Sequence, residues 1–389
     1  MKRAAIICFT DFVGEPRVIR TIEALKDRYD ITLYSCGKTM NGIKCEDVSG
    51  MDKDNDEINF HHNYPSWLKR IAAVILKISG YSFQSRKYYK RQYWSAGRKE
   101  LLAKVKEKNY DLVIGHGIYT LPVLAGLNTK TVFNAHEYYL KEFEESENWK
   151  KYVQPYYKFI LDNYLTKISL MFCVSKLIQD EYQKDYAVKS VEVTNATAFY
   201  DLKPIVTGSV INIIHHGAAI RTRQLELMGE MMDYLGEHYT LTFMLTRHDN
   251  EYLDELKDRF GNTKNIFFKE AVRVSEIAGV CNTFDIGLFI LPPVNFNWYY
   301  ALPNKLYEFI QGRLCVAVSP NPDMKRVVEE NELGVVSKDY TAQGMAAGIL
   351  KLTPERILYH KNKSHDCARV LNAGRTQKII LEEIAKLVN

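Results

Sequence analysis

The chain has 389 residues, of which 46% are hydrophobic and 25% are charged, and its formal net charge is +5. This is the composition of an ordinary soluble protein, and the length is too great for one core, so we expect two domains or three. Seven scattered cysteines without a C-x-x-C pair indicate a reduced, cytoplasmic protein, and no apolar run reaches the roughly 18 residues of a membrane span.

Short apolar runs alternate with longer segments of helical period in the first half of the chain. Residues 4–9 are predicted to form a strand, and residues 16–28 a helix with Pro16 in its first turn. Ser175 is expected to cap the last helix of this half. Alternating units of this kind predict a mostly parallel, doubly wound sheet, with further strands at 31–35, 110–115, 131–134 and 170–174.

The same pattern restarts after a polar stretch at 201–209 that contains Pro204 and Gly208. We therefore predict a first domain over 1–203 and a second over 204–370. A final helix at about 371–389 is not followed by a strand. Ligands of open α/β sheets bind at the carboxyl ends of the strands, which here are predicted at 210–214, 241–245, 266–268, 286–291 and 315–318.

The segment from Pro303 to Glu308 carries the clearest chemical signal. Pro303 or Asn304 is expected to begin a helix, whose free N–H groups and dipole favour a phosphate. Lys305 adds a positive charge in the first turn, and Leu306 follows it. Glu308 lies about one turn further on, where a carboxylate can accept hydrogen bonds from both hydroxyls of a ribose. The alternative is a helix N-terminus that binds no ligand.

Here the sequence resembles the retaining GT-B glycosyltransferases of family 4, whose bacterial polysaccharide members often carry P-x-K-x-x-E-x-x-x-x-G. Pro303, Lys305, Glu308 and Gly312 match this pattern. The resemblance implies two Rossmann-like domains that face each other across a cleft, with the C-terminal helix crossing back to the first. It also implies that Glu308 binds the ribose and that the 304–306 end of the helix binds the diphosphate of a sugar nucleotide.

Two more segments of the second domain are matched through this resemblance. A glycine loop with a basic residue about six positions on meets the donor diphosphate in the family. Gly217 and Arg223 have this spacing, and Arg221 is a neighbour of Arg223. Guanidinium groups suit bidentate phosphate contacts. Backbone contacts with the base are expected near Ala271 and Val272. The alternative for the arginines is two solvated side chains in a loop.

In the first domain, His136 and Glu137 follow a predicted strand. Family members often carry His followed by an acid here, facing the transferred sugar and the acceptor, and a His at this position can donate a hydrogen bond or shuttle a proton. A satisfied structural histidine is the alternative. The loop with Asp11, Gly14 and Arg17 matches the acceptor-side loop of the family, although the usual Gly-Gly pair is missing.

The sequence departs from the family at Tyr300, where a second glutamate often stands eight residues before the ribose glutamate. An aromatic loop over 295–300 replaces it, so the resemblance does not identify the sugar. A carboxylate nucleophile is not evident. Retention of configuration is therefore implied only by the resemblance.

Several other motifs do not predict function. The D-x-D patterns at 52–56 lie in an acidic polar stretch, and the residues after His136-Glu137 do not complete H-E-x-x-H. His61-His62 and His215-His216 lack ligand spacing. A P-loop and a G-x-G-x-x-G are both absent from the sequence.

Residues 67–108 are strongly basic and carry interleaved tyrosine and tryptophan. No nucleic-acid-binding module accompanies this charge, so an anionic membrane surface is the better hypothesis, and a solvated helix pair that covers the sheet is the alternative.

The sequence thus predicts a glycosyltransferase that moves a sugar from a UDP-, GDP- or ADP-linked donor to a glycan or lipid-linked acceptor. We expect no metal and no cofactor, because the nucleotide sugar is a substrate. The expected place is the cytoplasm, on the inner face of the membrane. Alternatives are a GT-B-like sugar-nucleotide epimerase or hydrolase and a degenerate, non-catalytic nucleotide-binding protein.

Overall fold

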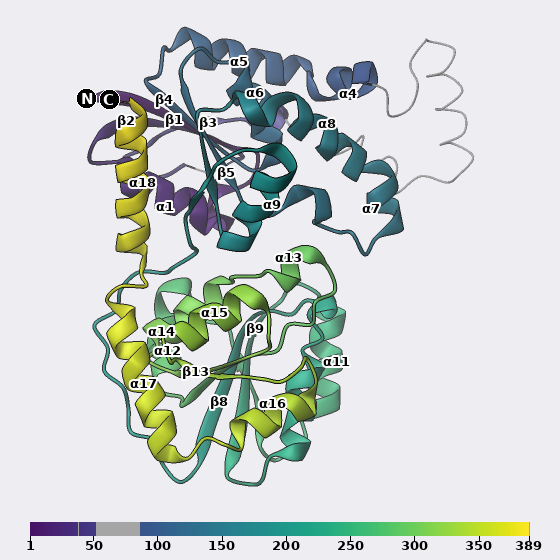
Figure 1. Cartoon of the computed structure of the whole chain (residues 1–389), viewed down its shortest axis with the longest axis vertical. Coiled ribbons are helices and arrows are strands. Elements are labelled where there is room, and N and C mark those ends of the chain that lie inside the picture. The colour runs from purple at the N-terminus through teal and green to yellow at the C-terminus, as the bar shows by residue number, and fades with distance from the viewer. Residues whose placement is uncertain (38, 52–85, 389) are drawn as a thin grey trace. The chain divides into compact units, whose positions relative to one another are not determined.

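The computed structural model describes residues 1–37, 39–51 and 86–388, and its contacts divide the chain into two units. The first unit comprises Met1–Val193 with Gln377–Asn389, and the second comprises Thr194–Thr376. The D-x-D patterns at 52–56 and His61-His62 lie outside the described residues. Figure 1 shows the elements of both units.

The first unit is built on a seven-stranded parallel sheet with the order β3-β2-β1-β4-β5-β6-β7. The order runs outward in both directions from β1 and β4, which makes this pair the topological switch point. The strands are β1 (Lys2–Cys8), β2 (Tyr29–Ser35), β3 (Lys44–Asp47), β4 (Leu112–His116), β5 (Lys130–Ala135), β6 (Leu170–Cys173) and β7 (Val191–Glu192).

Helices cover both faces of this sheet, with α5, α6 and α8 on one side and α1 and α18 on the other (Figure 1). Ser175 caps α9 as predicted, because its Oγ accepts a hydrogen bond from the N–H of Ile178. The helices are α1 (Pro16–Leu25), α4 (Arg86–Tyr93), α5 (Ala96–Glu107), α6 (Leu121–Ala125), α7 (Glu147–Tyr152), α8 (Gln154–Tyr164) and α9 (Lys176–Tyr186), with short 3-10 turns η1 (Phe12–Gly14), η2 (Ser49–Met51), η3 (Ile118–Thr120), η4 (Tyr139–Lys141) and η5 (Leu165–Lys167).

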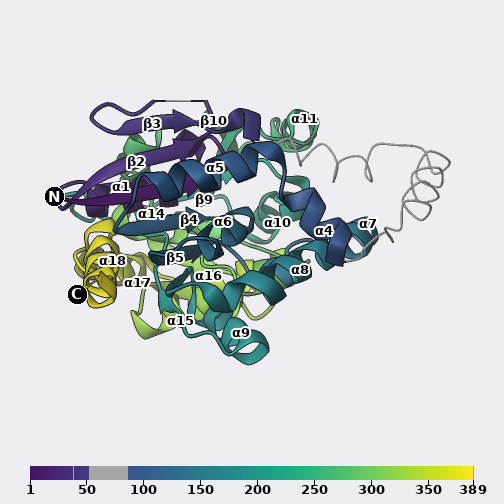
Figure 2. The same ribbon diagram turned by 90° about the horizontal axis from the view of Figure 1, so that it is seen from above.

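The C-terminal helix α18 (Ala373–Val388) returns to the first unit, as the resemblance implied. Ile380 and Ile384 are buried in the same core as β1, β2 and α1. Lys2 Nζ donates to the carbonyl of Val388 at 3.2 Å, and Figure 2 shows the two ends of the chain near each other. The apolar face of this helix therefore completes the first core.

The second unit contains a six-stranded parallel sheet with the order β10-β9-β8-β11-β12-β13, and its switch point lies between β8 and β11. The strands are β8 (Ile211–Ala218), β9 (Tyr239–Thr246), β10 (Ile266–Glu270), β11 (Ile286–Phe289), β12 (Cys315–Val318) and β13 (Gly334–Val336).

Two cores lie on the two faces of this sheet. One is formed with α10 (Glu226–Met231), α11 (Asn250–Phe260) and α16 (Ala342–Ile349), and the other with α12 (Ile277–Asn282), α14 (Asn304–Gln311) and α15 (Pro322–Glu330). α17 (Pro354–Ala368) contributes to both, and the remaining elements are α13 (Phe296–Tyr299), η6 (Arg221–Arg223), η7 (Met232–Tyr234) and η8 (Val274–Glu276).

The contacts place the division between the units after Val193, whereas the sequence predicted it after residue 203. The intervening segment is bound to the second unit. Ala196 is buried in the core of α14, and the buried Arg313 donates to the carbonyls of Tyr200 at 2.5 Å and Leu202 at 3.2 Å. These bonds between distant residues leave no trace in the local composition of the segment.

Candidate functional site

The N-terminus of α14 lies at the switch point of the second sheet. The helix follows β11, begins at Asn304 as predicted, and is preceded by Pro303 in an extended conformation that provides no side-chain cap. The first N–H groups of such a helix are available to an anion, and the helix dipole favours one there. This end of α14 therefore supplies a phosphate-binding geometry.

Lys305 lies buried in the first turn of this helix, with only 6% of its surface exposed. Its Nζ is 3.5 Å from His215 Nε2 and 3.8 Å from the centre of the Phe289 ring. Burial lowers the pKa of Lys305 well below its usual value, the Arg223 charge lowers it further, and Glu308 opposes both. Burial and the Arg223 charge thus destabilise the ammonium form of Lys305, and an anionic ligand would stabilise it.

Gly217 allows the close approach of β8 to this lysine. Its φ is +130°, and a Cβ atom at this position would lie 3.1 Å from Lys305 Nζ. A side chain would therefore both strain the backbone and displace the ammonium group. Glycine at position 217 is thus required both by its positive φ and by the nearby ammonium group of Lys305.

Two histidines that the sequence analysis set aside are part of this cluster. The Nδ1 atom of His215 is 2.9 Å from the carbonyl oxygen of Leu288, which can only accept, so Nδ1 carries the proton and Nε2 is free to accept from Lys305. His216 Nε2 lies 3.5 Å from Glu308 Oε2. Burial, and then the Lys305 charge, lower the pKa of His216 to about 3. The signal that could have identified both is their position at a strand end directly before Gly217.

The structure separates the two arginines of the loop. Arg221 makes two hydrogen bonds with Glu255, of 2.6 and 2.9 Å, and its guanidinium lies 5.0 Å from the centre of the Tyr252 ring. Arg223 instead lies within electrostatic range of Lys305, donates to the Ala218 carbonyl at 3.4 Å, and has its pKa lowered by burial. Arg223 therefore lies near Lys305, whereas Arg221 is bound to Glu255 on α11.

Glu308 lies one turn further along α14 and is 9% exposed. Gly312 directly follows this helix, where an added Cβ would lie 2.6 Å from Cys281 Cβ. Ala271 and Val272 follow β10 at the same edge of the sheet; Ala271 is exposed, and Val272 packs against the core of α14. Gly217, Arg223 and Glu308 thus all lie near Lys305 within the second unit.

The aromatic loop before α14 is held in place by polar side chains. Asn295 caps α13 by accepting from the N–H of Trp298 at 2.9 Å. Asn321 donates to the carbonyls of Leu291 at 3.2 Å and Trp298 at 2.8 Å. The ring of Tyr300 packs on Phe296 at 4.5 Å between ring centres. These hydrogen bonds and ring contacts fix the conformation of the loop.

A second cluster lies at the carboxyl edge of the first sheet, next to its switch point. His116 ends β4, His136 follows β5, and their rings approach to 3.4 Å between Nδ1 of His116 and Nε2 of His136. His136 Nδ1 is also 3.9 Å from Glu15 Oε2. Burial and the Arg17 charge lower the pKa of both histidines, that of His116 to about 3. Both rings are therefore neutral at pH 7 and can donate or accept a hydrogen bond.

Glu137 and Arg17 belong to the same cluster. Burial raises the pKa of Glu137, and the Arg17 charge opposes this effect. Tyr182 on α9 fixes the backbone after β5. Its hydroxyl donates to the Glu137 carbonyl at 2.9 Å and accepts from the Tyr139 N–H at 3.3 Å. From the sequence, Glu137 was predicted at a strand end and Arg17 in a separate loop, so their proximity was not predicted.

The three residues of the acceptor-side loop have different positions. Asp11 caps the turn η1, with Oδ1 accepting from the Val13 N–H at 3.0 Å, and Gly14 ends this turn. Arg17 interacts electrostatically with Glu137. Glu15 and His116 also belong to the cluster and were not predicted from the sequence.

The basic region is described only from residue 86 onwards, so its part at 67–85 lies outside the described residues. On α4 the side chains of Tyr89 and Tyr93 are buried, whereas Tyr88 and Trp94 are half-buried. The cations remain exposed at Arg86, Lys87, Lys90, Arg91 and Lys99. This surface is therefore basic, and two of its aromatic side chains contribute to the core. In the described part of the chain, no helix is both long enough and apolar enough to cross a membrane.

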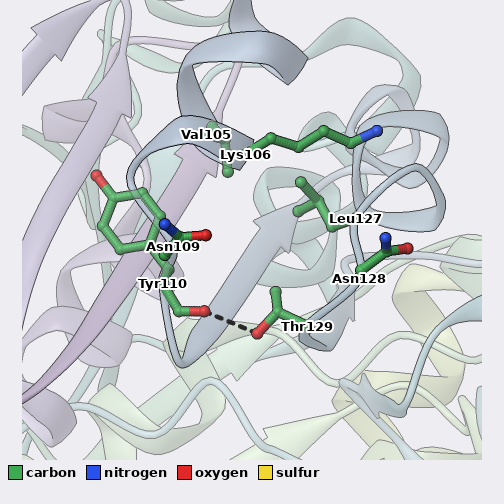
Figure 3. Close-up of a pocket in the computed structure, with 7 residues that line it drawn as sticks. All are labelled: Val105, Lys106, Asn109, Tyr110, Leu127, Asn128 and Thr129. Carbon is green, nitrogen blue, oxygen red and sulfur yellow. Dashed lines mark hydrogen bonds between the residues drawn. The ribbon is translucent and has the colours of Figure 1, made fainter.

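A pocket of about 310 Å³ lies at the other edge of the first sheet (Figure 3). Its walls precede β4 and β5, at the amino ends of these strands, so it is separate from the His116–His136 cluster. The Thr129 hydroxyl donates across it to the Tyr110 carbonyl at 2.8 Å. The lining residues are Val105, Lys106, Asn109, Tyr110, Leu127, Asn128 and Thr129.

Comparison with known proteins identifies the fold. No protein-family model and no curated protein sequence matches the chain. Among solved structures, a sucrose-phosphate synthase from Thermosynechococcus elongatus has a TM-score of 0.71 at 11% identity and covers 100% of this chain and 99% of its own. HepE from Anabaena, solved with UDP-glucose, has a TM-score of 0.69 at 12% identity over 100% of both chains. A glycosyltransferase from Rickettsia africae has a TM-score of 0.67 at 12% identity, covering 100% of this chain and 99% of its own. With its two parallel-sheet domains, the chain has the GT-B fold.

Proposed function

We propose that this protein is a glycosyltransferase that moves a sugar from a nucleotide-sugar donor to a glycan or lipid-linked glycan. The observation that carries this proposal is the buried Lys305 at the N-terminus of α14, surrounded by other cationic or neutral basic groups and opposed by Glu308. A diphosphate supplies the missing negative charge, and the helix end supplies hydrogen-bond donors for it. Solved structures of the same fold with UDP and UDP-glucose bound support a uridine donor.

The donor is assigned to the second unit. Lys305, Arg223 and the first N–H groups of α14, at Asn304 to Leu306, bind the diphosphate, and Glu308 accepts hydrogen bonds from the ribose. The backbone at Ala271 and Val272 contacts the base, as the resemblance implies. These cations also stabilise the leaving diphosphate as its charge grows, which is the part that a metal ion plays in other transferases.

The acceptor is assigned to the first unit. His136 and Glu137 are proposed to orient the reacting hydroxyl, with Arg17 fixing the carboxylate of Glu137. Transfer with retention of configuration, in the biosynthesis of a polysaccharide or another cell-surface glycan, is proposed on the family resemblance.

A nucleotide panel tests the donor assignment. UDP at about 100 times its Kd contributes about 2.7 kcal/mol to the folded state and is expected to raise Tm by roughly 5 °C, whereas GDP and ADP are expected to raise it less. Differential scanning fluorimetry measures these shifts. Equal shifts with all three would contradict a uridine donor, and no shift with any would contradict nucleotide binding. Consumption of UDP-sugar without any acceptor would favour the epimerase or hydrolase instead.

We also propose that the exposed cations of α4 bring the protein to the anionic inner face of the cytoplasmic membrane. Each lysine or arginine near such a surface contributes about 1 kcal/mol, so neutralising four of them should weaken binding by at least about 100-fold. In the test variant, Arg86, Lys87, Lys90 and Arg91 are all replaced by Gln. Its flotation with phosphatidylglycerol-containing vesicles is compared with that of the wild type. The control neutralises four exposed lysines elsewhere, Lys176, Lys184, Lys325 and Lys351. Flotation that survives only in the control supports the proposal, and flotation that survives in both contradicts it.

A further inference from the structure

A second carboxyl group lies beside Glu137 and has no place in the function proposed above. Glu142 directly follows the turn η4, and its Oε2 atom is buried without a hydrogen-bond partner among the residues that the structure describes. A buried carboxylate oxygen without a partner is costly, whereas a neutral carboxyl group in the same place costs much less. The position therefore favours a protonated Glu142.

The groups around Glu142 lead to the same conclusion. The negative charge that acts on it is that of Glu137, and burial together with this charge raises the pKa of Glu142 to about 8. Two phenols interact with it, those of Tyr139 on η4 and Tyr157 on α8, and both have pKa values raised by burial, so they are neutral. Lys141, its neighbour in the chain, reaches Glu181 at 3.7 Å.

Glu137 differs from Glu142 because a cation acts on it. Burial raises the pKa of Glu137, the Arg17 charge opposes this effect, and the charge of Glu15 adds to it. Two neighbouring carboxyl groups lose their protons in two separate steps. After the first step, the remaining proton resides on the group whose ionised form is less stabilised. Arg17 favours the ionised form of Glu137, whereas the charge that acts on Glu142 is negative, so Glu142 is the carboxyl group that ionises less readily.

We propose that Glu142 is a positioning residue for acceptor binding: its carboxyl group stays neutral in the buried cluster, so that Glu137 is the ionised group that accepts a hydrogen bond from an acceptor hydroxyl. This inference rests on the transferase function proposed above. Ionisation of Glu142 places a second negative charge in the buried site and disturbs the orientation of Glu137. The acceptor KM should therefore rise in alkaline solution.

The proton on Glu142 can be measured without any acceptor. The folded-state pKa of Glu142, about 8, lies above that of an unfolded glutamate, so folding retains a proton between these values and stability falls as pH rises through this window. The ratio of unfolding constants of wild type and Glu142→Gln should change by up to about tenfold per pH unit between roughly pH 6 and 8. The carbonyl infrared band of a protonated carboxylic acid should be present in the wild type at pH 7 and absent in Glu142→Gln.

Glu145→Gln is the matched control, because it removes an exposed carboxylate from the same segment. It should retain both the infrared band and the wild-type dependence of Tm on pH. If Glu142→Gln also retains them, Glu142 does not carry the proton and the inference is overturned.

The role in acceptor binding is tested with UDP-glucose and a panel of p-nitrophenyl glycosides as acceptors. Glu142→Gln should abolish the alkaline rise in acceptor KM, and Glu142→Ala should raise acceptor KM roughly tenfold at all pH values, with donor KM unchanged. Turnover with the same pH profile in the wild type and in Glu142→Gln overturns the inference alone. If the infrared band is present but no variant consumes UDP-glucose, the transferase function fails, and the role of Glu142 fails with it.

Discussion

Replacement of Lys305 by methionine is expected to weaken UDP binding by roughly 100-fold while leaving the affinity for uridine unchanged. Methionine keeps the length and apolar stem of the side chain but removes the charge that faces Gly217 and His215. A charge-assisted hydrogen bond to phosphate contributes about 1.5–3 kcal/mol, and a tenfold change in Kd corresponds to 1.4 kcal/mol. Isothermal titration calorimetry with UDP and with uridine separates the two effects.

The same variant should not be less stable than the wild type. The pKa of Lys305 is lowered by burial, which means that the ammonium group is destabilised in the folded protein at pH 7. Removing this charge should leave Tm unchanged or higher, so a loss of UDP binding cannot be ascribed to unfolding. Lys325→Met, at an exposed position on α15, is the control and should bind UDP as the wild type does. Equal affinity of Lys305→Met and wild type for UDP would refute the diphosphate site.

Replacement of Glu308 by alanine is expected to reduce UDP affinity by roughly 100-fold, because a carboxylate that accepts from two ribose hydroxyls makes two charge-assisted hydrogen bonds. The sharper measurement compares UDP with its 2′,3′-dideoxy analogue. The wild type should prefer UDP strongly, and Glu308→Ala should bind both ligands with similar, weak affinity. In such a cycle the coupling between the side chain and the hydroxyls is isolated from other effects of the substitution.

Glu308→Gln refines this experiment. The amide keeps the volume beside His216, whose Nε2 lies 3.5 Å from the carboxylate in the wild type. We expect it to recover part of the affinity for UDP, since one amide oxygen can still accept. Glu329→Ala, at an exposed position on α15, is the control. If Glu308→Ala retained the full preference for UDP over the dideoxy analogue, Glu308 would not contact the ribose.

Much of the architecture follows from the sequence because it depends on local patterns. Apolar runs of strand length predicted the central strands of both sheets, and Ser175 and Pro303 marked the starts of two helices. Three strands were not predicted, β3, β7 and β13. They are short edge strands whose residues are exposed or half-buried, so their pairing with a neighbour defines them rather than their own composition.

Within the donor site, the sequence alone determined that a lysine and a glutamate lie one turn apart at the start of a helix after a buried strand. Tertiary structure decided which distant groups meet them. Arg221 and Arg223 have the same side chain and lie two residues apart, yet Arg221 pairs with Glu255 and Arg223 lies near Lys305. Helical and strand periodicity is set by adjacent residues, whereas these contacts depend on the register of β8 beside β9 and β11.

The same reason explains the first unit. His136 and Glu137 could be selected from the sequence as polar residues at a strand end. Glu142, Glu15 and His116 could not, because their protonation depends on burial and on charges brought from other elements. The sequence by itself determined two α/β halves and a phosphate-binding helix start. Only the tertiary structure decided which carboxyl and imidazole groups are charged, since desolvation and distances between side chains are properties of the folded chain.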